Sequence, residues 1–263
     1  MEEKFLNTSY GNVYYKISLK ENSKCLVFTH GLTADHSMFE KQTDFFDKDY
    51  SVILWDVPMH GKSRPYKNFS YSDSADVLKK ILEKENINSV FLIGQSMGGF
   101  VSQMFGYRYP QMVKAFISID STPFGMEYYS KSDQWWLRQV GWMSALFPHK
   151  TLVKSIAKSV SKSDFTYKNM TEMLSQYSKK EICRLLEIAY SQFLKENTDI
   201  SLNFPVLLIM GEYDKTGKVK EYCLHWSKNT GYPLKIIKNA AHNSNADNPE
   251  DVNKEIKNFI ELY

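Results

Sequence analysis

Short runs of apolar residues recur along the chain and alternate with stretches of helical periodicity. Six of these runs have the length of a single strand, and they lie at residues 25–28, 50–55, 90–93, 115–119, 206–210 and 234–237. Strands that are apolar at successive positions are typical of a parallel sheet covered on both faces. In between, residues 74–85 place Ala75, Leu78 and Leu82 on one helical face. The alternation predicts βαβ units and therefore an α/β fold.

The first and last segments of the chain add an element each to this pattern. Residues 4–9 and 13–20 are rich in β-formers and flank the turn-forming residues 10–12, so they predict an antiparallel hairpin. At the other end, residues 248–251 combine a proline with acidic residues, as helix starts do, and apolar residues then recur at helical spacing. We expect antiparallel strands to open the fold and an amphipathic helix to close it.

Residues 122–201 interrupt the alternation, because they contain no clear buried strand and are helical, aromatic and rich in lysine. A chain of 263 residues suits one sizeable domain with an insertion better than two independent domains. We therefore expect an α/β core formed by residues 1–121 and 202–263, and a helical cap formed by residues 122–201.

Composition and charge exclude several classes of protein. Hydrophobic residues make up 43% and charged residues 24%, which is typical of chains that fold on their own. The net charge is only +3, and lysines are interleaved with acidic residues, so nucleic-acid binding is not expected. No apolar run is long enough to span a membrane, and residues 1–5 lack the features of a signal peptide. We expect a soluble, cytoplasmic protein.

The three cysteines, Cys25, Cys183 and Cys223, are odd in number and widely spaced, and none belongs to a CxxC pair. This spacing predicts buried thiols and neither a disulfide framework nor a zinc site. We expect no metal and no cofactor.

The pattern Gly-x-Ser-x-Gly occurs at residues 94–98, between an apolar run and a helical pattern that begins near Phe100. A serine at the apex of a sharp strand-to-helix turn is strained and needs neighbours without side chains, which Gly94 and Gly98 supply. Serine also favours helix N-caps, so a capping role is the alternative. The placement favours Ser96 as a nucleophile.

A serine nucleophile needs a base, and histidine is the side chain best matched to that task. His242 follows the last predicted strand and precedes the last helix, so it projects from the same carboxyl edge of the sheet as Ser96. The other five histidines are expected at the surface or in supporting positions: His30, His36, His60, His149 and His225.

The imidazole must be held in one tautomer by a carboxylate at a neighbouring strand end. Asp214 follows the run 206–210 and is our first choice. Glu212 in the same loop and Asp120 at the end of the preceding strand are alternatives at the same sheet edge.

The tetrahedral intermediate of acyl transfer requires fixed hydrogen-bond donors, and backbone amides serve well. We expect one N–H from Met97, the residue after the nucleophile, and the other from Leu32 in the turn that follows residues 25–28. His30 is expected to support this turn.

Together, His30-Gly31, the loop 56–63, the elbow at Ser96, Asp214 and His242 resemble the α/β-hydrolase superfamily over essentially the whole chain. The resemblance implies a mostly parallel eight-stranded sheet with flanking helices and a helical cap insertion. The chain order Ser, Asp, His of that fold favours Asp214 as the acid. Relatives that open epoxides or remove halide have an aspartate in place of this serine, so those activities are not expected.

The elbow is similar to that of microbial carboxylesterases, monoacylglycerol lipases and carbon–carbon bond hydrolases, and it does not choose among their substrates. Two departures from the family are visible. Pro58-Met59-His60-Gly61 stands where Gly-His-Gly is usual, and the three consecutive glycines of the lipase oxyanion loop are absent. Esters of bulky tertiary alcohols are therefore not a first expectation.

Aromatic residues and methionines crowd the first part of the cap, and we expect some of them to wall the pocket. The residues chosen for this role are Phe124, Trp135, Trp142 and Met143. The chain's arginines are scattered and form no clamp for a phosphate or a dicarboxylate. The favoured substrate is a small to medium ester with an apolar acyl group.

Three functions are compatible with this pattern. The first is a serine esterase that acts through an acyl-enzyme. The second uses the same three side chains to cleave a carbon–carbon bond next to a ketone. The third is a small-molecule receptor that retains the fold and turns over slowly. The sequence leaves the oligomeric state open between monomer and homodimer.

Overall fold

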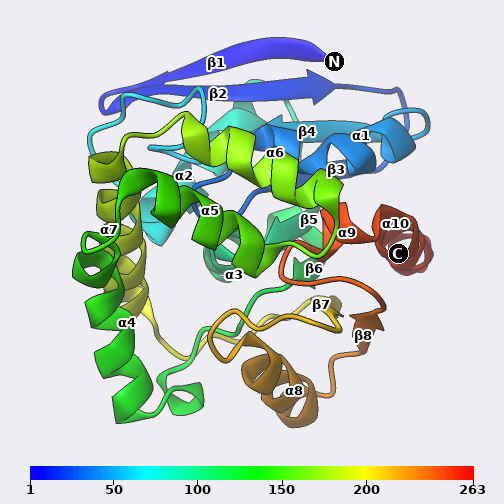
Figure 1. Cartoon of the computed structure of the whole chain (residues 1–263). Helices are drawn as coiled ribbons and strands as arrows, with labels where there is room; N and C mark the ends of the chain where they lie inside the picture. Colours follow the sequence, from blue (N-terminus) through cyan, green and yellow to red (C-terminus); the bar gives the residue numbers. More distant parts are fainter.

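The computed structural model describes residues 1–263 and contains one eight-stranded sheet between two layers of helices (Figure 1). The strands are β1 (Glu2–Thr8), β2 (Gly11–Ser18), β3 (Cys25–Thr29), β4 (Ser51–Trp55), β5 (Val90–Gln95), β6 (Val113–Ile119), β7 (Val206–Gly211) and β8 (Leu234–Ile237). Their order in the sheet is β1-β2-β4-β3-β5-β6-β7-β8. The pairs β1–β2 and β2–β4 are antiparallel, and all others are parallel.

This architecture confirms the predicted fold class. Every residue of β3, β4, β5 and β7 is buried, which explains why these strands are apolar throughout. The opening hairpin lies about two residues earlier than the sequence pattern indicated, because its edge strand β1 alternates in burial and carries a weak apolar signal.

Helices cover both faces of the sheet. Those outside the 122–201 segment are α1 (Glu40–Phe46), α2 (Tyr71–Lys84), α3 (Met97–Arg108), α8 (Val219–Thr230), α9 (Ser244–Asp247) and α10 (Pro249–Ile260). Helix α2 pairs with α3, and α1 pairs with α10. Right-handed crossovers explain this division, because β3-α1-β4 runs in one direction along the sheet and the later units run in the other.

The direction of winding reverses between β3 and β5, which are neighbours in the sheet. At such a switch point the loops at the carboxyl ends of adjacent strands diverge and leave a crevice. The loop after β3 contains Leu32, and the loop after β5 contains Ser96. The topology therefore places both segments at one crevice.

Four helices lie between β6 and β7: α4 (Lys131–Ser144), α5 (His149–Val160), α6 (Asp164–Ser175) and α7 (Lys179–Glu196). Helix α4 packs on α7, and α5 packs on α6. Two of these helices begin with a capping box, formed by Ser130 with Asp133 and by Ser178 with Glu181, which satisfies free N–H groups of the first turn. No helix in the structure combines the length and apolarity needed to cross a bilayer.

Candidate active site

Ser96 occupies a strained turn between β5 and α3. Its backbone angles are φ 50° and ψ −116°, and its side chain accepts no capping hydrogen bond. An N-cap serine has extended backbone and an engaged hydroxyl, so the capping alternative does not describe this residue. The helix begins at Met97, earlier than the periodicity indicated, because α3 is buried on most sides and carries little amphipathic signal.

The turn is closed by two glycines that have no room for a side chain. A Cβ on Gly94 would lie 2.4 Å from the carbonyl oxygen of Gly98, and a Cβ on Gly98 would lie 2.0 Å from that of Thr29. The elbow therefore sits directly against the end of β3. This contact holds Ser96 beside the loop that carries Leu32.

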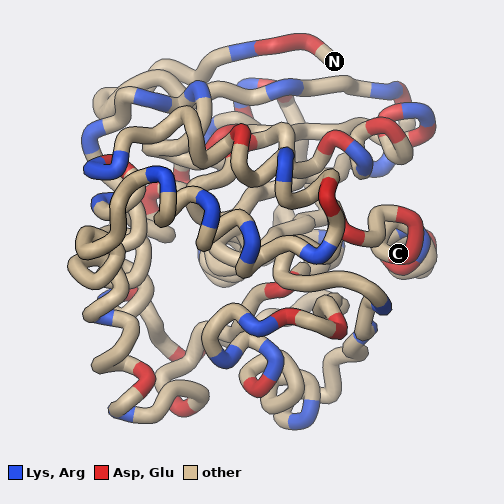
Figure 2. Tube along the Cα trace, in the orientation of Figure 1, with Lys and Arg blue, Asp and Glu red and all other residues tan.

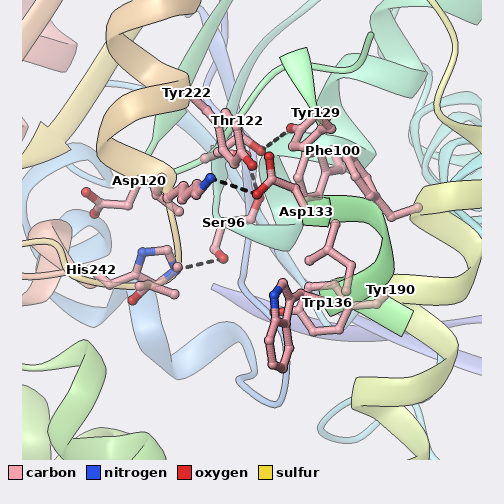
Figure 3. A pocket seen from close by; sticks show the side chains of 17 residues that line it. Ser96, Phe100, Asp120, Thr122, Tyr129, Asp133, Trp136, Tyr190, Tyr222 and His242 are labelled. Carbon is pink, nitrogen blue, oxygen red and sulfur yellow. Dashed lines mark hydrogen bonds and ion pairs between the residues drawn. The ribbon is translucent and has the colours of Figure 1, made fainter. Parts of the chain in front are cut away.

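His242 lies in the loop between β8 and α9, and its side chain is 7% exposed. Its Nε2 is 2.9 Å from the hydroxyl oxygen of Ser96, and its Nδ1 is 2.8 Å from Oδ2 of Asp214. An ionised carboxylate can only accept, so Nδ1–H donates to Asp214 and Nε2 accepts from the serine hydroxyl. Figure 3 shows Ser96 and His242 facing each other at one wall of a pocket.

The three carboxylates considered as the acid have different partners. Asp214 is fully buried at its carboxylate, and its second oxygen, Oδ1, accepts from the backbone N–H of Thr216 at 2.8 Å. Glu212 instead accepts from the backbone N–H of Asn239. Of the three, Asp214 is the carboxylate hydrogen-bonded to the imidazole.

Asp120 braces the loops that carry the other two groups. Its Oδ1 accepts from the N–H of Gly211 at 2.7 Å, and its Oδ2 accepts from the N–H of Ser244 at 2.9 Å. Burial, together with the nearby charge of Asp214, raises the pKa of Asp120 to about 8. Asp120 thus links the start of the Asp214 loop to the end of the His242 loop.

The electrostatic environment favours the protonated form of His242. Burial opposes a charge on the ring, but the charge of Asp214, its hydrogen bond and the more distant Asp120 outweigh it, so the pKa of His242 is raised. The imidazole is therefore a stronger base than histidine in water. This property suits a group that accepts a proton from a hydroxyl.

The backbone N–H groups of Leu32 and Met97 donate to no protein group. Met97 is the first residue of α3, where helical N–H groups lack intrahelical acceptors. His30 supports the Leu32 loop, because its Nδ1–H donates to the carbonyl of Gly31 and its Nε2 accepts from the N–H of Val57. Both unpaired amides thus belong to the segments that flank Ser96.

Of the four remaining histidines, three form hydrogen bonds away from Ser96, and His149 is the first residue of α5. His36 contacts Asp56 at 2.8 Å, His60 contacts the carbonyl of Pro58, and His225 contacts Asn229. Asp35, His36 and Asp56 place ligand atoms within 4.8 Å of one another and form the one group that could hold a cation. None of the three lines a pocket that reaches Ser96.

Gln95 is a part of the site that sequence reasoning missed. Its side-chain amide donates to the backbone carbonyl of His242 at 2.8 Å and to Oδ1 of Asn243 at 3.2 Å. The residue before Ser96 thereby fixes the loop that carries the imidazole. The Gly-x-Ser-x-Gly pattern accepts any residue at this position, so no local signal could have identified it.

Two pockets meet at Ser96 and His242. The aromatic pocket has a volume of about 400 Å³, and the aromatic side chains in its lining are Phe100, Tyr129, Trp136, Tyr190, Phe193 and Tyr222. The aliphatic pocket has a volume of about 530 Å³, and the aliphatic side chains in its lining include Leu32, Met38, Val140, Leu152, Ile156 and Leu186. Trp136 and Tyr190 line both pockets.

The two pockets differ in their charged residues. An ion pair of 2.8 Å joins Asp133 of α4 to Lys218 just before α8 and lies in the wall of the aromatic pocket (Figure 3). The aliphatic pocket has no charged side chain in its lining apart from His242 when that ring is protonated. No arginine lines either pocket.

Of the four side chains that the sequence predicted to line the substrate pocket, one lies in a pocket that reaches Ser96. Met143 lines the aliphatic pocket. Trp135 and Trp142 are 52% and 57% exposed and line neither pocket, and Phe124 is buried next to a different, smaller cavity. Aromatic residues occur on several sides of α4, so periodicity could not show that Trp136 is the tryptophan that lines both pockets.

Residues 24–249 match the model of a protein family described as alpha/beta hydrolase fold. Among curated relatives, a putative esterase/lipase of Haemophilus influenzae is 29% identical over 46% of this chain and 42% of its own length. The 2-succinyl-6-hydroxy-2,4-cyclohexadiene-1-carboxylate synthase of Citrobacter koseri is 25% identical over 91% of this chain and 95% of its own length.

This chain spans less than half the length of two curated relatives that it matches. It covers 42% of the Haemophilus influenzae protein and 37% of a probable serine hydrolase of Drosophila melanogaster. Among solved structures, a thermophilic esterase from Thermogutta terrifontis superposes with a TM-score of 0.81 at 16% identity and covers 100% of this chain and 99% of that one. The architecture is thus shared over the full chain with proteins of very different sequence.

Proposed function

Because this chain belongs to the α/β-hydrolase family, we propose that it is a serine hydrolase that cleaves a small to medium carboxylic ester through an acyl-enzyme. One observation carries the proposal: the buried hydrogen-bond chain from the hydroxyl of Ser96 through the imidazole of His242 to the carboxylate of Asp214. A serine hydroxyl is a weak nucleophile on its own and becomes effective beside an oriented base. The elbow presents this hydroxyl to both pockets.

The proposed reaction proceeds in two similar halves. Oγ of Ser96 attacks the acyl carbon and transfers its proton to Nε2 of His242, while Asp214 stabilises the imidazolium. The N–H groups of Leu32 and Met97 bind the oxyanion of the tetrahedral intermediate. His242 then returns the proton to the leaving alcohol. Water attacks the acyl-enzyme by the same route and releases the acid.

The two pockets support a division of the substrate. We assign the acyl chain to the aliphatic pocket, because its lining is mostly hydrocarbon and a medium chain would be well covered there. The alcohol is assigned to the aromatic pocket, whose lining includes polar side chains such as Thr122 and the Asp133–Lys218 ion pair. Trp136 stands between the two halves.

The pocket lining favours an uncharged ester over a substrate that carries carboxylates. The Citrobacter relative is named for a succinyl-substituted carboxylate, and recognition of carboxylates is typically provided by arginine. Neither pocket contains an arginine, and the one lysine, Lys218, is already paired with Asp133. The lining supports an apolar, uncharged acyl group.

We also propose that residues 122–201 act as a cap on a core made of residues 1–121 and 202–263. Helices α4, α5 and α7 contribute residues to the pockets, such as Trp136, Ile156 and Tyr190. The core contributes Ser96 and His242. In this division the core supplies the chemistry and the cap selects the substrate.

The test is labelling of the purified chain with a fluorophosphonate, combined with hydrolysis of p-nitrophenyl esters of increasing acyl length. Ser96→Ala should abolish both labelling and hydrolysis. Ser102→Ala is a matched control, because Ser102 is a buried serine on α3 without a hydrogen-bond partner, and it should retain both. If the unchanged chain is labelled at Ser96 yet hydrolyses no ester or thioester, a binding function replaces the esterase proposal.

A further inference from the structure

The first half of the cap contains a segment without a single acidic residue. Residues 134–163 include no Asp or Glu but contain one arginine and four lysines. Three of the lysines, Lys150, Lys154 and Lys158, are exposed at a spacing of four on α5. None of them takes part in any ion pair of the structure. Figure 2 shows the basic positions recurring along α5 without an acidic one.

The same segment exposes an unusual amount of apolar surface. Of the 18 large apolar side chains that are exposed on the whole chain, six lie within residues 135–147. Trp135, Trp142 and Leu146 are 52%, 57% and 72% exposed. The indole N–H of Trp142 donates to Gln139 of the same helix at 2.7 Å, so this ring has no unmet polar demand that water must satisfy. Apolar surface of this kind marks an interaction site.

Helix geometry directs the basic stripe away from the protein. On α5, Leu152, Ile156 and Val160 line the aliphatic pocket. Lys150, Lys154 and Lys158 are offset from them by two positions, about 200° around the helix, so they occupy the opposite face. The apolar segment ends in the turn between α4 and α5, directly before the start of this stripe in the chain.

We propose that this part of the protein docks on an anionic lipid surface. We call the docking residues the cap face, which consists of Trp135, Trp142, Leu146, Lys150, Lys154 and Lys158. Indole and leucine side chains enter the boundary between headgroups and acyl chains, and lysines are attracted to anionic headgroups. A second copy of the chain fits the face poorly. A symmetric contact would bring two acid-free basic segments together with no charge to neutralise them.

The position of the cap face connects docking to the candidate active site. Trp136, Met143 and Phe147 are exposed members of the same segment, and all three also line the aliphatic pocket that reaches Ser96. An apolar molecule dissolved in a lipid surface could therefore pass from it into the pocket along apolar side chains. Docking itself does not depend on catalysis, so it can be tested separately from the proposed function.

The experiment measures co-sedimentation of the full chain with vesicles of phosphatidylcholine, with and without phosphatidylglycerol. We expect tight binding only when phosphatidylglycerol is present, in the unchanged chain and equally in Ser96→Ala. Replacing Lys150, Lys154 and Lys158 by Gln should weaken binding by about fivefold per lysine, on the order of a hundredfold in all. The variant with Trp142→Ser and Leu146→Ser should bind weakly to both kinds of vesicle.

A matched control changes the same charge elsewhere. Lys80, Lys114 and Lys228 are exposed and make no ion pair, so their replacement by Gln should leave vesicle binding within a few-fold of the unchanged chain. Equal loss in the two triple variants, or no binding to either vesicle, would overturn the proposal. So would a dimer in sedimentation velocity that Trp142→Ser and Leu146→Ser convert to a monomer, because a second copy would then cover the face. Thermal melts verify that each variant is folded.

Discussion

Replacing Asp214 by Asn tests the buried hydrogen-bond chain most directly. Oδ1 of Asp214 accepts from the N–H of Thr216 at 2.8 Å, so the amide oxygen of an asparagine would keep that position. The amide NH2 would then face Nδ1 of His242, 2.8 Å away. Nδ1 would have to become an acceptor, and the ring proton would move to Nε2. In that tautomer Nε2–H donates to Ser96 and cannot accept its proton.

The size of the effect follows from this tautomer change. A histidine fixed in the wrong tautomer lowers kcat by about 10⁴-fold in a serine hydrolase of known mechanism, or ~5 kcal/mol of transition-state stabilisation. The charge and hydrogen bond of Asp214 also raise the pKa of His242, so their loss should lower the basicity of whatever base remains. We expect Asp214→Asn to lose about 10⁴-fold in kcat with KM little changed.

The assay is steady-state hydrolysis of p-nitrophenyl butyrate, with Asp120→Asn as the matched control. Asp120 is equally buried and also near His242, but its oxygens accept from Gly211 and Ser244. Its replacement should cost about 1–3 kcal/mol of unfolding free energy, because one backbone N–H then faces an amide NH2, and it should reduce kcat far less. If Asp120→Asn proves the more damaging change while Asp214→Asn stays within tenfold of the unchanged chain, the assignment of the acid is wrong.

Three further predictions concern pH, the elbow and the pocket. The pKa of His242 is raised above 6.5, so kcat/KM should rise with pH through an apparent pKa above 6.5. The stability that protonation of His242 contributes should be present below pH 6.5 and lost above the folded pKa. A rate profile with its acid limb below pH 6.5 would contradict this. Gly98→Ala should lower the free energy of unfolding by about 1–3 kcal/mol or more in urea titrations, because the new Cβ would lie 2.0 Å from the Thr29 carbonyl oxygen, and an unchanged midpoint would refute the close contact. Val140→Trp should fill part of the aliphatic pocket and reduce kcat/KM for octanoyl esters while sparing acetyl esters, and an equal effect on both chain lengths would remove the acyl chain from this pocket.

Much of the fold could be predicted from the chain because its signals are local. Residues buried on both faces of the sheet must be apolar at successive positions, so β3, β4, β5 and β7 were visible as runs. The elbow was visible for a similar reason, since a strained turn packed against Thr29 tolerates only glycine at Gly94 and Gly98. The boundaries of β1 and α3 were less distinct, because β1 is an edge strand without a fully buried residue and α3 is buried on most sides.

The partners of each polar group could not be predicted in the same way. Asp214, Asp120 and Glu212 all follow strands that end at one sheet edge, and a position in the chain does not say which carboxylate meets the imidazole. The same holds for Gln95, whose contact with the carbonyl of His242 joins residues 147 positions apart. Such contacts depend on how loops from different strands pack over the switch point.

What the amino-acid order determined by itself is the alternation of strands and helices and the tight turn that presents Ser96, because both depend on neighbours in the chain. Tertiary structure decided that Asp214 rather than Asp120 reaches His242, and that Trp136 lines both pockets whereas Trp142, which is equally exposed, lines neither. The physical reason is that hydrogen-bond distance and helix rotation are set by packing among segments far apart in sequence.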